Sequence, residues 1–495
     1  MKILLVHPSP LMHAEIFLRL EPLGLERVGQ ALRSAGHHLS LLDLQVLRHK
    51  DYFRELNSFR PQALGFSLNY LPNVPEVVDL AIETRRRLPG CFIFVGGHSA
   101  SFIAADLIDH ARGAIDCVVR GEGEAIAPRL LEHVPDGKLE SLPGIVTPHG
   151  SGPPPILTTS LDEPLPARDL TRKRKKYFIG QLDPCASVEF TRGCPWDCSF
   201  CSGWTFYGRT YRKASPEAIA EDLSRVREPN VFIVDDVAFI RPDHALAVGK
   251  EIEKRGIQKQ YYLETRCDVL IRNREVFSYW KRLGLKYMFL GFEAIDEEVL
   301  KLYRKRISLD DNFQALEIAQ DLGIMAAINL IADPDWDEKQ FQLVRQWAES
   351  VPAVVNLTVS TPYPGTETWY TESRKLTTLD YRLFDVQHAV LPTRLPLMKF
   401  YEELVKTQAV LNRKYMGLAA VRKASSIVLG HLFRGQTNFL KMIWKFNRVF
   451  NPERLHNHHF RAEEYALQPP PPAVHKPTPE ELYVHLPLEK GTAHS

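Results

Sequence analysis

Short apolar segments alternate with helix-like segments along most of this 495-residue chain, and this alternation limits the fold more than any other feature. A strand that is buried on both faces reads as a short apolar run, and helices between such runs indicate a parallel sheet. The first series of strand candidates lies at residues 2–6, 39–44, 63–66, 91–95 and 115–119. It predicts a doubly wound α/β domain over residues 1–150.

A second series of strand candidates follows at residues 187–190, 231–234, 261–264, 287–290, 326–331 and 354–359. Six strand–helix units within about 185 residues suit a partial or full (β/α) barrel, and we predict the partial form over residues 183–375. In this architecture the functional side chains lie at the carboxyl ends of the strands.

Composition sets the remaining segments apart. Residues 151–182 are rich in proline and charge and are predicted to form a linker, with the basic run 172–176 as a solvated loop. Residues 376–467 are predicted to be a mainly helical extension. Between positions 399 and 462, 12 Lys and Arg residues outnumber 3 Asp and Glu residues. Residues 468–495 begin beside four prolines and are predicted to be a flexible tail.

The formal net charge is only +2, so composition gives no reason to expect a nucleic-acid partner. The short apolar N-terminus is unlike a signal peptide, and no window reaches the roughly 18 apolar residues of a spanning helix. We therefore expect a cytoplasmic protein. Residues 427–450 mix aromatic and basic side chains, and two interpretations stay open: a peripheral helix on the inner face of the membrane, or a packed helix with a basic outer face.

Three of the seven cysteines, Cys194, Cys198 and Cys201, fall within eight residues after a predicted strand. So few cysteines in a chain without an export signal argue against a disulfide framework. A structural zinc site needs a fourth protein ligand, and no second close pair lies nearby. Three thiolates at C-x3-C-x2-C spacing on one loop instead suit a [4Fe–4S] cluster with one iron left open to a further ligand.

The run from Thr191 to Cys201 resembles the signature of the radical S-adenosylmethionine (SAM) enzymes. The resemblance implies that the open iron chelates SAM, that Phe200 lies near the adenine, and that one electron from the cluster cleaves SAM to a deoxyadenosyl radical. Glu293 follows a segment similar to the family's glycine-rich glutamate motif and is expected to accept hydrogen bonds from the SAM ammonium, although Phe292 replaces the usual second small residue. Arg266 is a candidate for the SAM carboxylate, with a surface ion pair as an equal alternative.

Small residues follow successive strands of the first domain, at Ser67-Leu68, at Gly96-Gly97-His98 and in the run 121–124. Glycine at a strand end lets the backbone approach a ligand closely. These segments are similar to the cobalamin-binding domains fused to radical SAM enzymes, and the first two are expected to contact cobalamin. The D-x-H-x-x-G motif of many such domains is absent after the first strand, so neither His7 nor His13 is assigned as a cobalt ligand.

The chain also resembles the hopanoid C-3 methylase branch of this family over about residues 1–460, in the segments 6–11, 20–24, 65–70, 96–101, 201–209 and 232–239. The resemblance implies methylation of an unactivated carbon of a hydrophobic triterpenoid, C-3 of the hopanoid A-ring. Methylcobalamin is the expected methyl donor, and flavodoxin or ferredoxin the expected electron donor. No side-chain base is predicted, since cofactors carry this chemistry.

Three alternatives stay open. Another cobalamin-dependent radical SAM enzyme, such as a tetrapyrrole cyclase, has the same two domains. A noncatalytic cobalamin or iron–sulfur sensor needs an output module, and no helix-turn-helix pattern is evident. A transfer-RNA methylthiolation enzyme is disfavoured, because it normally has a second three-cysteine cluster. The other cysteines lack that spacing: Cys91, Cys117, Cys185 and Cys267.

Overall fold

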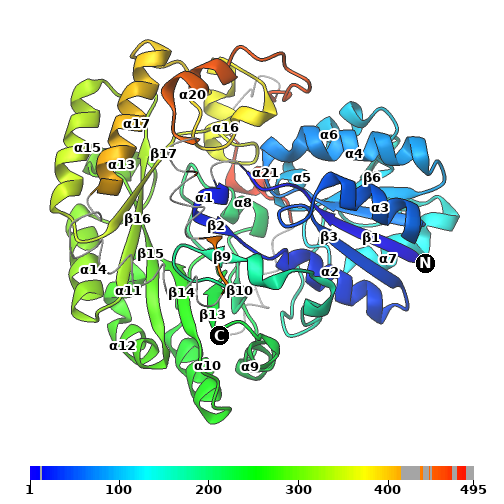
Figure 1. The fold of residues 1–495 in the computed structure, drawn as a ribbon, viewed down its shortest axis with the longest axis horizontal. Coiled ribbons are helices and arrows are strands. Elements are labelled where there is room, and N and C mark those ends of the chain that lie inside the picture. Colours follow the sequence, from blue (N-terminus) through cyan, green and yellow to red (C-terminus); the bar gives the residue numbers. More distant parts are fainter. Residues whose placement is uncertain (12–13, 414–434, 439–444, 446–448, 471–476, 486–495) are drawn as a thin grey trace.

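The computed structural model describes residues 1–11, 14–413, 435–438, 445, 449–470 and 477–485. Two α/β domains lie side by side, and the helical segments that follow the second domain pack beside both (Figure 1). The basic stretch 427–450, for which two interpretations are open, lies largely outside the described residues.

The first domain has a seven-stranded sheet with helices on both faces. The strands run in the order β3 (His38–Asp43), β1 (Lys2–His7), β4 (Ala63–Ser67), β5 (Phe92–Gly96), β6 (Cys117–Val119), β7 (Ile145–Thr147) and β8 (Gly150–Ser151). The first five are parallel, whereas β7 and β8 form an antiparallel edge. Helices α3 (His49–Phe59), α4 (Val74–Arg87) and α6 (Ala104–Ala111) cover one face, and α2 (Leu23–Ser34) and α7 (Ile126–His133) cover the other. The predicted doubly wound fold is confirmed.

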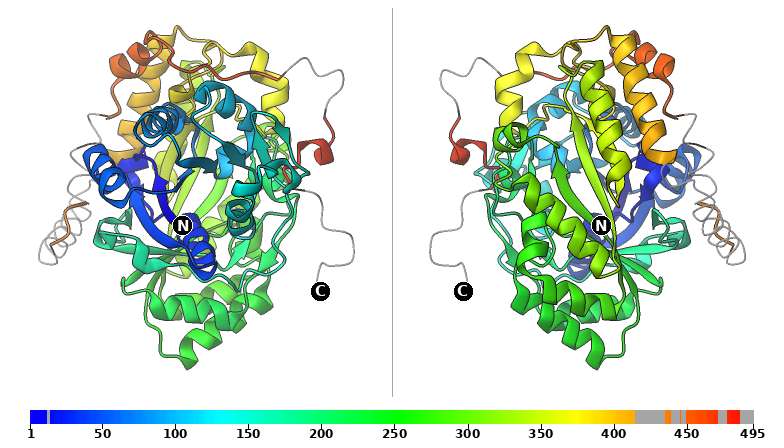
Figure 2. Two further views of the ribbon diagram at one scale, coloured as in Figure 1. Left: turned by 90° about the vertical axis from the view of Figure 1, so that its right-hand side faces the viewer. Right: turned by 90° about the vertical axis from the view of Figure 1, so that its left-hand side faces the viewer.

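The second domain is a curved sheet of six parallel strands. Its order is β10 (Cys185–Val188), β13 (Asn230–Ile233), β14 (Gln260–Thr265), β15 (Leu285–Glu293), β16 (Met325–Ala332) and β17 (Val354–Val359). Among the described residues β10 and β17 do not pair, so the barrel is partial, as predicted. Helices line its outer side (Figure 2): α9 (Pro216–Arg225), α10 (Pro242–Lys254), α11 (Cys267–Arg272), α12 (Arg274–Leu283), α14 (Leu309–Asp321), α15 (Glu338–Ser350) and α17 (Leu397–Arg413). Helix α13 (Glu297–Leu302) follows β15 and lies beside Ser199, whose hydroxyl donates to the Leu302 carbonyl at 3.3 Å.

Shorter elements connect the domains and border the space between them. The helices are α1 (Ala14–Phe17), α5 (His98–Phe102), α8 (Gly203–Tyr207), α16 (Glu367–Glu372), α20 (Pro452–His458) and α21 (Pro479–Leu482). The strands are β2 (Leu18–Arg19), paired with β9 (Phe178–Ile179), and β11 (Thr191–Arg192), paired with β12 (Arg212–Lys213). Single 3-10 turns lie at Leu71–Asn73, Val134–Asp136, Leu139–Ser141, Arg168–Leu170, Arg174–Lys176, Ser373–Lys375 and Tyr381–Leu383.

The segment predicted to be a linker is fixed in place by buried ion pairs. Arg168 is 7% exposed and bonds Glu21 of the first domain at 2.8 Å and Asp222 of the second at 2.6 Å. Arg174, in the run that we expected to be solvated, contacts Glu21 at 2.6 Å and Glu26 at 3.2 Å. Glu21 and Glu26 lie 153 and 148 residues before Arg174 in the sequence, and this accounts for the difference, because they become its neighbours only in the fold.

Part of the segment predicted to be a flexible tail also differs from expectation, and residues 471–476 and 486–495 of that segment lie outside the described residues. Residues 477–485 pack against both domains, with Leu482, Val484 and His485 at most 5% exposed. Residues 483–485 contact α8 through the rings of Tyr483 and His485 and the Val484 amide. The polar and proline-rich composition of this segment does not indicate these contacts.

We predict that Arg168→Met lowers the free energy of unfolding by about 3–5 kcal/mol, because it leaves the carboxylates of Glu21 and Asp222 buried without their partner. Arg33→Met is the matched control, since Arg33 pairs with Asp169 at an exposed position and surface pairs contribute at most ~1 kcal/mol. Urea titration of both variants measures the difference. Equal losses in the two variants would contradict the prediction.

We predict a pH dependence of stability from Glu26. Burial, and then the charge of Glu21, raise the pKa of Glu26 to about 8 from an ordinary 4.5. The folded chain therefore holds a proton that the unfolded chain releases, and this contribution to stability is full below pH 4.5 and declines as the pH rises toward about 8. Glu26→Gln removes the decline in thermal melts between these pH values, whereas the exposed control Glu132→Gln leaves it unchanged.

Candidate active site

The three clustered cysteines lie on the loop between β11 and α8, and hydrogen bonds between side chains and backbone groups hold this loop. Asp235, after β13, accepts bonds from the Phe190 and Thr191 amides at 2.8 and 3.0 Å. The next residue, Asp236, accepts a bond from the Gly193 amide at 2.8 Å. At the other end the Trp204 indole donates to the Cys198 carbonyl at 2.9 Å. These four hydrogen bonds hold the loop in place.

The chemistry of these thiols fits a metal cluster. Cys198 is buried, and burial raises the pKa of Cys194 to about 12 and that of Cys201 to about 11. Such thiols stay protonated unless a cation displaces the proton, and metal ligation does so. In the described part of the chain no three His, Cys, Asp or Glu side chains are placed so that they could together hold one metal ion. A [4Fe–4S] cluster distributes its thiolates over separate irons, so the three cysteines stay its predicted ligands.

Arg266 lies beside the cysteine loop and not at the surface. It is 4% exposed, its guanidinium carbon is 4.3 Å from the centre of the Trp196 ring, and Nη1 is 4.0 Å from the Cys198 sulfur. It also donates to Asp268 at 2.8 Å and to the Lys305 carbonyl at 2.7 Å. This position is compatible with a bound carboxylate, and the contact with SAM stays a prediction.

Glu293 ends β15 inside the barrel and pairs with the buried Lys305 at 2.8 Å. Its φ of +67° is uncommon for a residue with a side chain, and such backbone often marks a functional position. At Gly291 a Cβ atom would come within 2.6 Å of the Lys305 ammonium, so a side chain at the first glycine of the motif would displace the ends of the Lys305 and Glu293 side chains. Phe292, the departure from the motif, points into the outer core toward Trp347.

Two further carboxyl groups share the barrel interior with Glu293. Burial, and then the charges of Asp236 and Glu293, raise the pKa of Glu264 to about 7. Burial also raises the pKa of Asp236. The sequence places both residues at strand ends, but only the structure shows that they face the same space as Glu293. Phe200, the predicted adenine neighbour, packs edge-on against Tyr303 at 5.1 Å.

In the first domain, the predicted cobalamin contacts lie at the carboxyl ends of β4 and β5. Ser67, Gly96, Gly97 and His98 line a slot of about 230 Å³. The Leu68 side chain is fully buried in the core, and its backbone amide donates to the Gly96 carbonyl at 2.7 Å. Six glycines line this slot: Gly24, Gly65, Gly96, Gly97, Gly121 and Gly123. At Gly24 no atom lies within 4 Å of the place of a Cβ, so a ligand such as cobalamin has room to lie against the backbone there, whereas protein atoms already fill that place at Gly65, Gly97 and Gly121.

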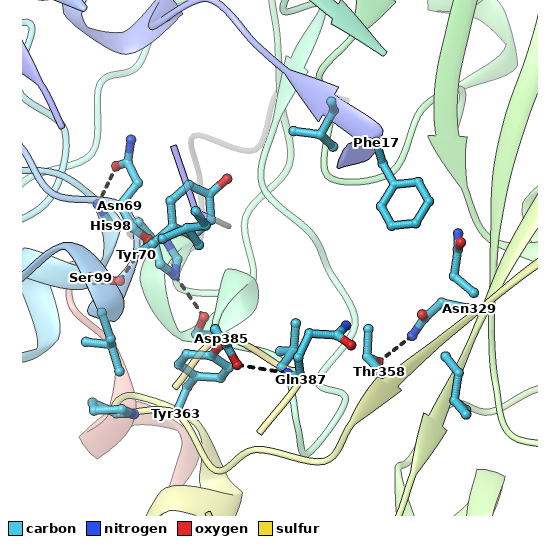
Figure 3. A pocket seen from close by; sticks show the side chains of 18 of the residues that line it. Phe17, Asn69, Tyr70, His98, Ser99, Asn329, Thr358, Tyr363, Asp385 and Gln387 are labelled. Carbon is cyan, nitrogen blue, oxygen red and sulfur yellow. Dashed lines mark hydrogen bonds between the residues drawn. The ribbon is translucent and has the colours of Figure 1, made fainter. Parts of the chain in front are cut away.

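A larger cavity of about 510 Å³ lies between the two domains (Figure 3). Asn69, Tyr70 and Ser99 reach it from the first domain, and Asn329 and Thr358 from the barrel. The remaining labelled side chains are Phe17, His98, Tyr363, Asp385 and Gln387. Asn69, Tyr70 and Asn329 were not assigned from the sequence, although the first two directly follow the predicted Ser67-Leu68 segment.

His98 joins the slot to the cavity and belongs to the lining of both. Its Nε2 lies 2.8 Å from the hydroxyl of Ser202, the residue after the last clustered cysteine. Its ring stacks on Phe206 of α8 at 4.8 Å. Burial lowers the pKa of His98 to about 4, so the imidazole is neutral at pH 7. The first domain thus contacts the cysteine loop directly.

Comparison with known proteins agrees with this geometry. Residues 188–348 match the "Radical SAM superfamily" model, and residues 11–131 match the "B12 binding domain" model. The fold and site define a cobalamin-dependent radical SAM enzyme, with a [4Fe–4S] cluster, SAM and cobalamin as cofactors. The chain is 62% identical over 487 residues to the hopanoid C-3 methylase of Methylococcus capsulatus, covering 98% of this chain and 95% of that protein. It belongs to the family of that methylase.

More distant relatives share the architecture. The chain is 26% identical over 430 residues to an anaerobic magnesium-protoporphyrin IX monomethyl ester cyclase of Synechocystis, covering 81% and 83% of the two chains. The methyltransferase TsrM from Kitasatospora setae, solved with cobalamin and a [4Fe-4S] cluster, superposes with a TM-score of 0.62 at 16% identity, covering 79% and 82%. OxsB, solved with aqua-cobalamin and SAM, superposes with a TM-score of 0.64 at 16% identity. The match covers 92% of this chain and 80% of OxsB. Both structures have the fold of this chain.

The described part of the chain contains no helix that is both long enough and apolar enough to cross a bilayer.

We predict that Cys198→Ala loses most of the iron that the wild-type chain takes up on anaerobic reconstitution, about four irons per chain for one cluster. Cys117→Ala is the control, because Cys117 is buried in the core of the first domain. Colorimetric iron and sulfide assays measure both variants. Full iron content in Cys198→Ala would refute the assignment of this cysteine.

Proposed function

We propose that this chain is a cobalamin-dependent radical SAM methyltransferase that methylates C-3 of the A-ring of a hopanoid. One observation carries the proposal: a single cavity is bordered by the predicted cobalamin domain and the barrel, and His98 at its edge contacts the cysteine loop. The 62% identity to the hopanoid C-3 methylase supports the choice of substrate.

When bound, the cluster, SAM and cobalamin supply a radical on the substrate and the methyl group that it receives. The chain's own contribution is to bind and orient. Cys194, Cys198 and Cys201 are the proposed cluster ligands. Glu293 and Glu264 present carboxylate oxygens to the ammonium and hydroxyl groups of SAM, and Arg266 presents a guanidinium to a carboxylate.

The cavity walls suit an apolar substrate. Leu11, Phe17, Leu71, Phe102 and Phe450 line them beside a similar number of polar residues, and most of the exposed wall area is apolar. Apolar walls exclude water, which protects a reactive carbon radical from side reactions. Replacing hydrogen by methyl at a saturated carbon requires no enolate or carbanion, so no side-chain base is assigned.

A one-electron donor of the flavodoxin or ferredoxin type completes the proposal, because the cluster requires external reduction.

We place the chain in the cytoplasm, with a peripheral contact at the inner face of the membrane through residues 427–450 as the route to a lipid substrate.

We predict that expression in a hopanoid-producing host without A-ring methylation yields hopanoids one CH₂ heavier, labelled from [methyl-¹³C]methionine. Mass spectrometry of the lipid extract measures the product. The Cys201→Ala chain is the control and yields none. Formation of 5′-deoxyadenosine by the purified enzyme without any methylated lipid would contradict the proposal, and turnover of a tetrapyrrole instead would favour a cyclase.

A further inference from the structure

The C-terminal strap, residues 477–485, runs along α8 directly behind the cysteine loop (Figure 1). The Val484 amide donates to the Thr205 carbonyl at 2.9 Å. The ring of Tyr483 packs edge-on against Trp204 at 6.1 Å, and Trp204 is the residue whose indole holds the Cys198 carbonyl. The strap therefore supports the second domain next to the predicted cluster.

His485, at the end of the strap, bridges the two domains and is 1% exposed. The Glu122 amide of the first domain donates to His485 Nε2 at 3.3 Å. Because Nε2 accepts this bond, the neutral ring carries its hydrogen on Nδ1, which lies 2.5 Å from the Phe206 carbonyl of α8 and donates to it. One imidazole thus satisfies a backbone group of each domain.

Gly121 explains how a histidine fits at this position. A Cβ atom there would lie 2.5 Å from His485 Nε2, and the residue has a φ of +80°. The run 121–124 lines the slot, and its first glycine also makes room for the strap. Gly121 suits this position for two reasons: glycine adopts a positive φ without strain, and it has no side chain to collide with His485.

The two residues that His485 holds are walls of the cobalamin slot. Glu122 and Phe206 both line it. The Phe206 ring lies between the rings of His485, at 5.2 Å, and His98, at 4.8 Å. The Glu122 carboxylate accepts bonds from Arg192 at 2.8 Å and from Arg212 at 2.8 Å. Loss of the strap removes a support from each wall at the same place.

We propose that the strap is a clamp that retains cobalamin, with His485 as the positioning residue that holds Glu122 and Phe206 against the slot. Cobalamin enters or leaves when the strap withdraws from Gly121 and α8. The proposal rests on the assignment of the slot to cobalamin, and it adds a role for a segment outside both cofactor domains.

The test measures release of cobalamin, not turnover. The full-length chain is loaded with hydroxocobalamin, mixed with excess ⁵⁷Co-labelled cobalamin, and sampled over time by rapid gel filtration. His485→Ala releases cobalamin about tenfold faster than wild type, because two buried hydrogen bonds and a ring contact are lost. His485→Phe keeps the ring contact and gives a smaller increase. Glu480→Gln, on the exposed side of the same strap, releases cobalamin at the wild-type rate.

A chain that ends at residue 476 releases cobalamin at least as fast as His485→Ala. If this shortened chain does not fold, the release rates of the point variants test the clamp. Unchanged release from His485→Ala, or a lower melting temperature with unchanged release, overturns the clamp while leaving the proposed function intact. A wild-type chain that binds no cobalamin overturns both proposals.

Discussion

Paired charges buried between the two domains are the constraint on which the rest of the structure depends. Glu122 of the first domain accepts from Arg192 and Arg212 of the second; burial alone would raise its pKa, but Arg192 and then Arg212 outweigh burial and hold the pKa at about 2. Arg168 connects Glu21 to Asp222 in the same way. A charge removed from water is tolerated only with its partner, so the domains cannot rotate apart without a large cost in free energy.

Because the two domains keep this orientation, residues at the carboxyl ends of both sheets border one site. The loops after β4 and β5 and the interior of the barrel border the same cavity (Figure 3). Neither domain alone encloses it, since Tyr70 and Asn329 come from different domains. Methyl transfer requires both cofactor regions to reach one carbon atom, and the interface charges set that distance.

The sequence contains most of the fold because its strands are buried on both faces and therefore read as apolar runs. It identifies the cysteine loop because three cysteines in one short run leave few alternatives. The sequence does not reveal that Arg266 is buried beside that loop. The exposure of the Arg266 side chain depends on Trp196 and Lys305, which pack around it only in the fold. Nor does the sequence indicate the partners of Arg174 or His485, which lie in distant segments and follow no periodic pattern.

The strap follows both sheets in the sequence, and this order has a consequence for biosynthesis. Domains fold largely as units while the chain is made, N-terminal first. Both sheets are complete by residue 359, more than 100 residues before the strap is translated. The interval leaves time for a large cofactor to be inserted before the last residues reach α8, so the order of synthesis can itself serve as the order of assembly.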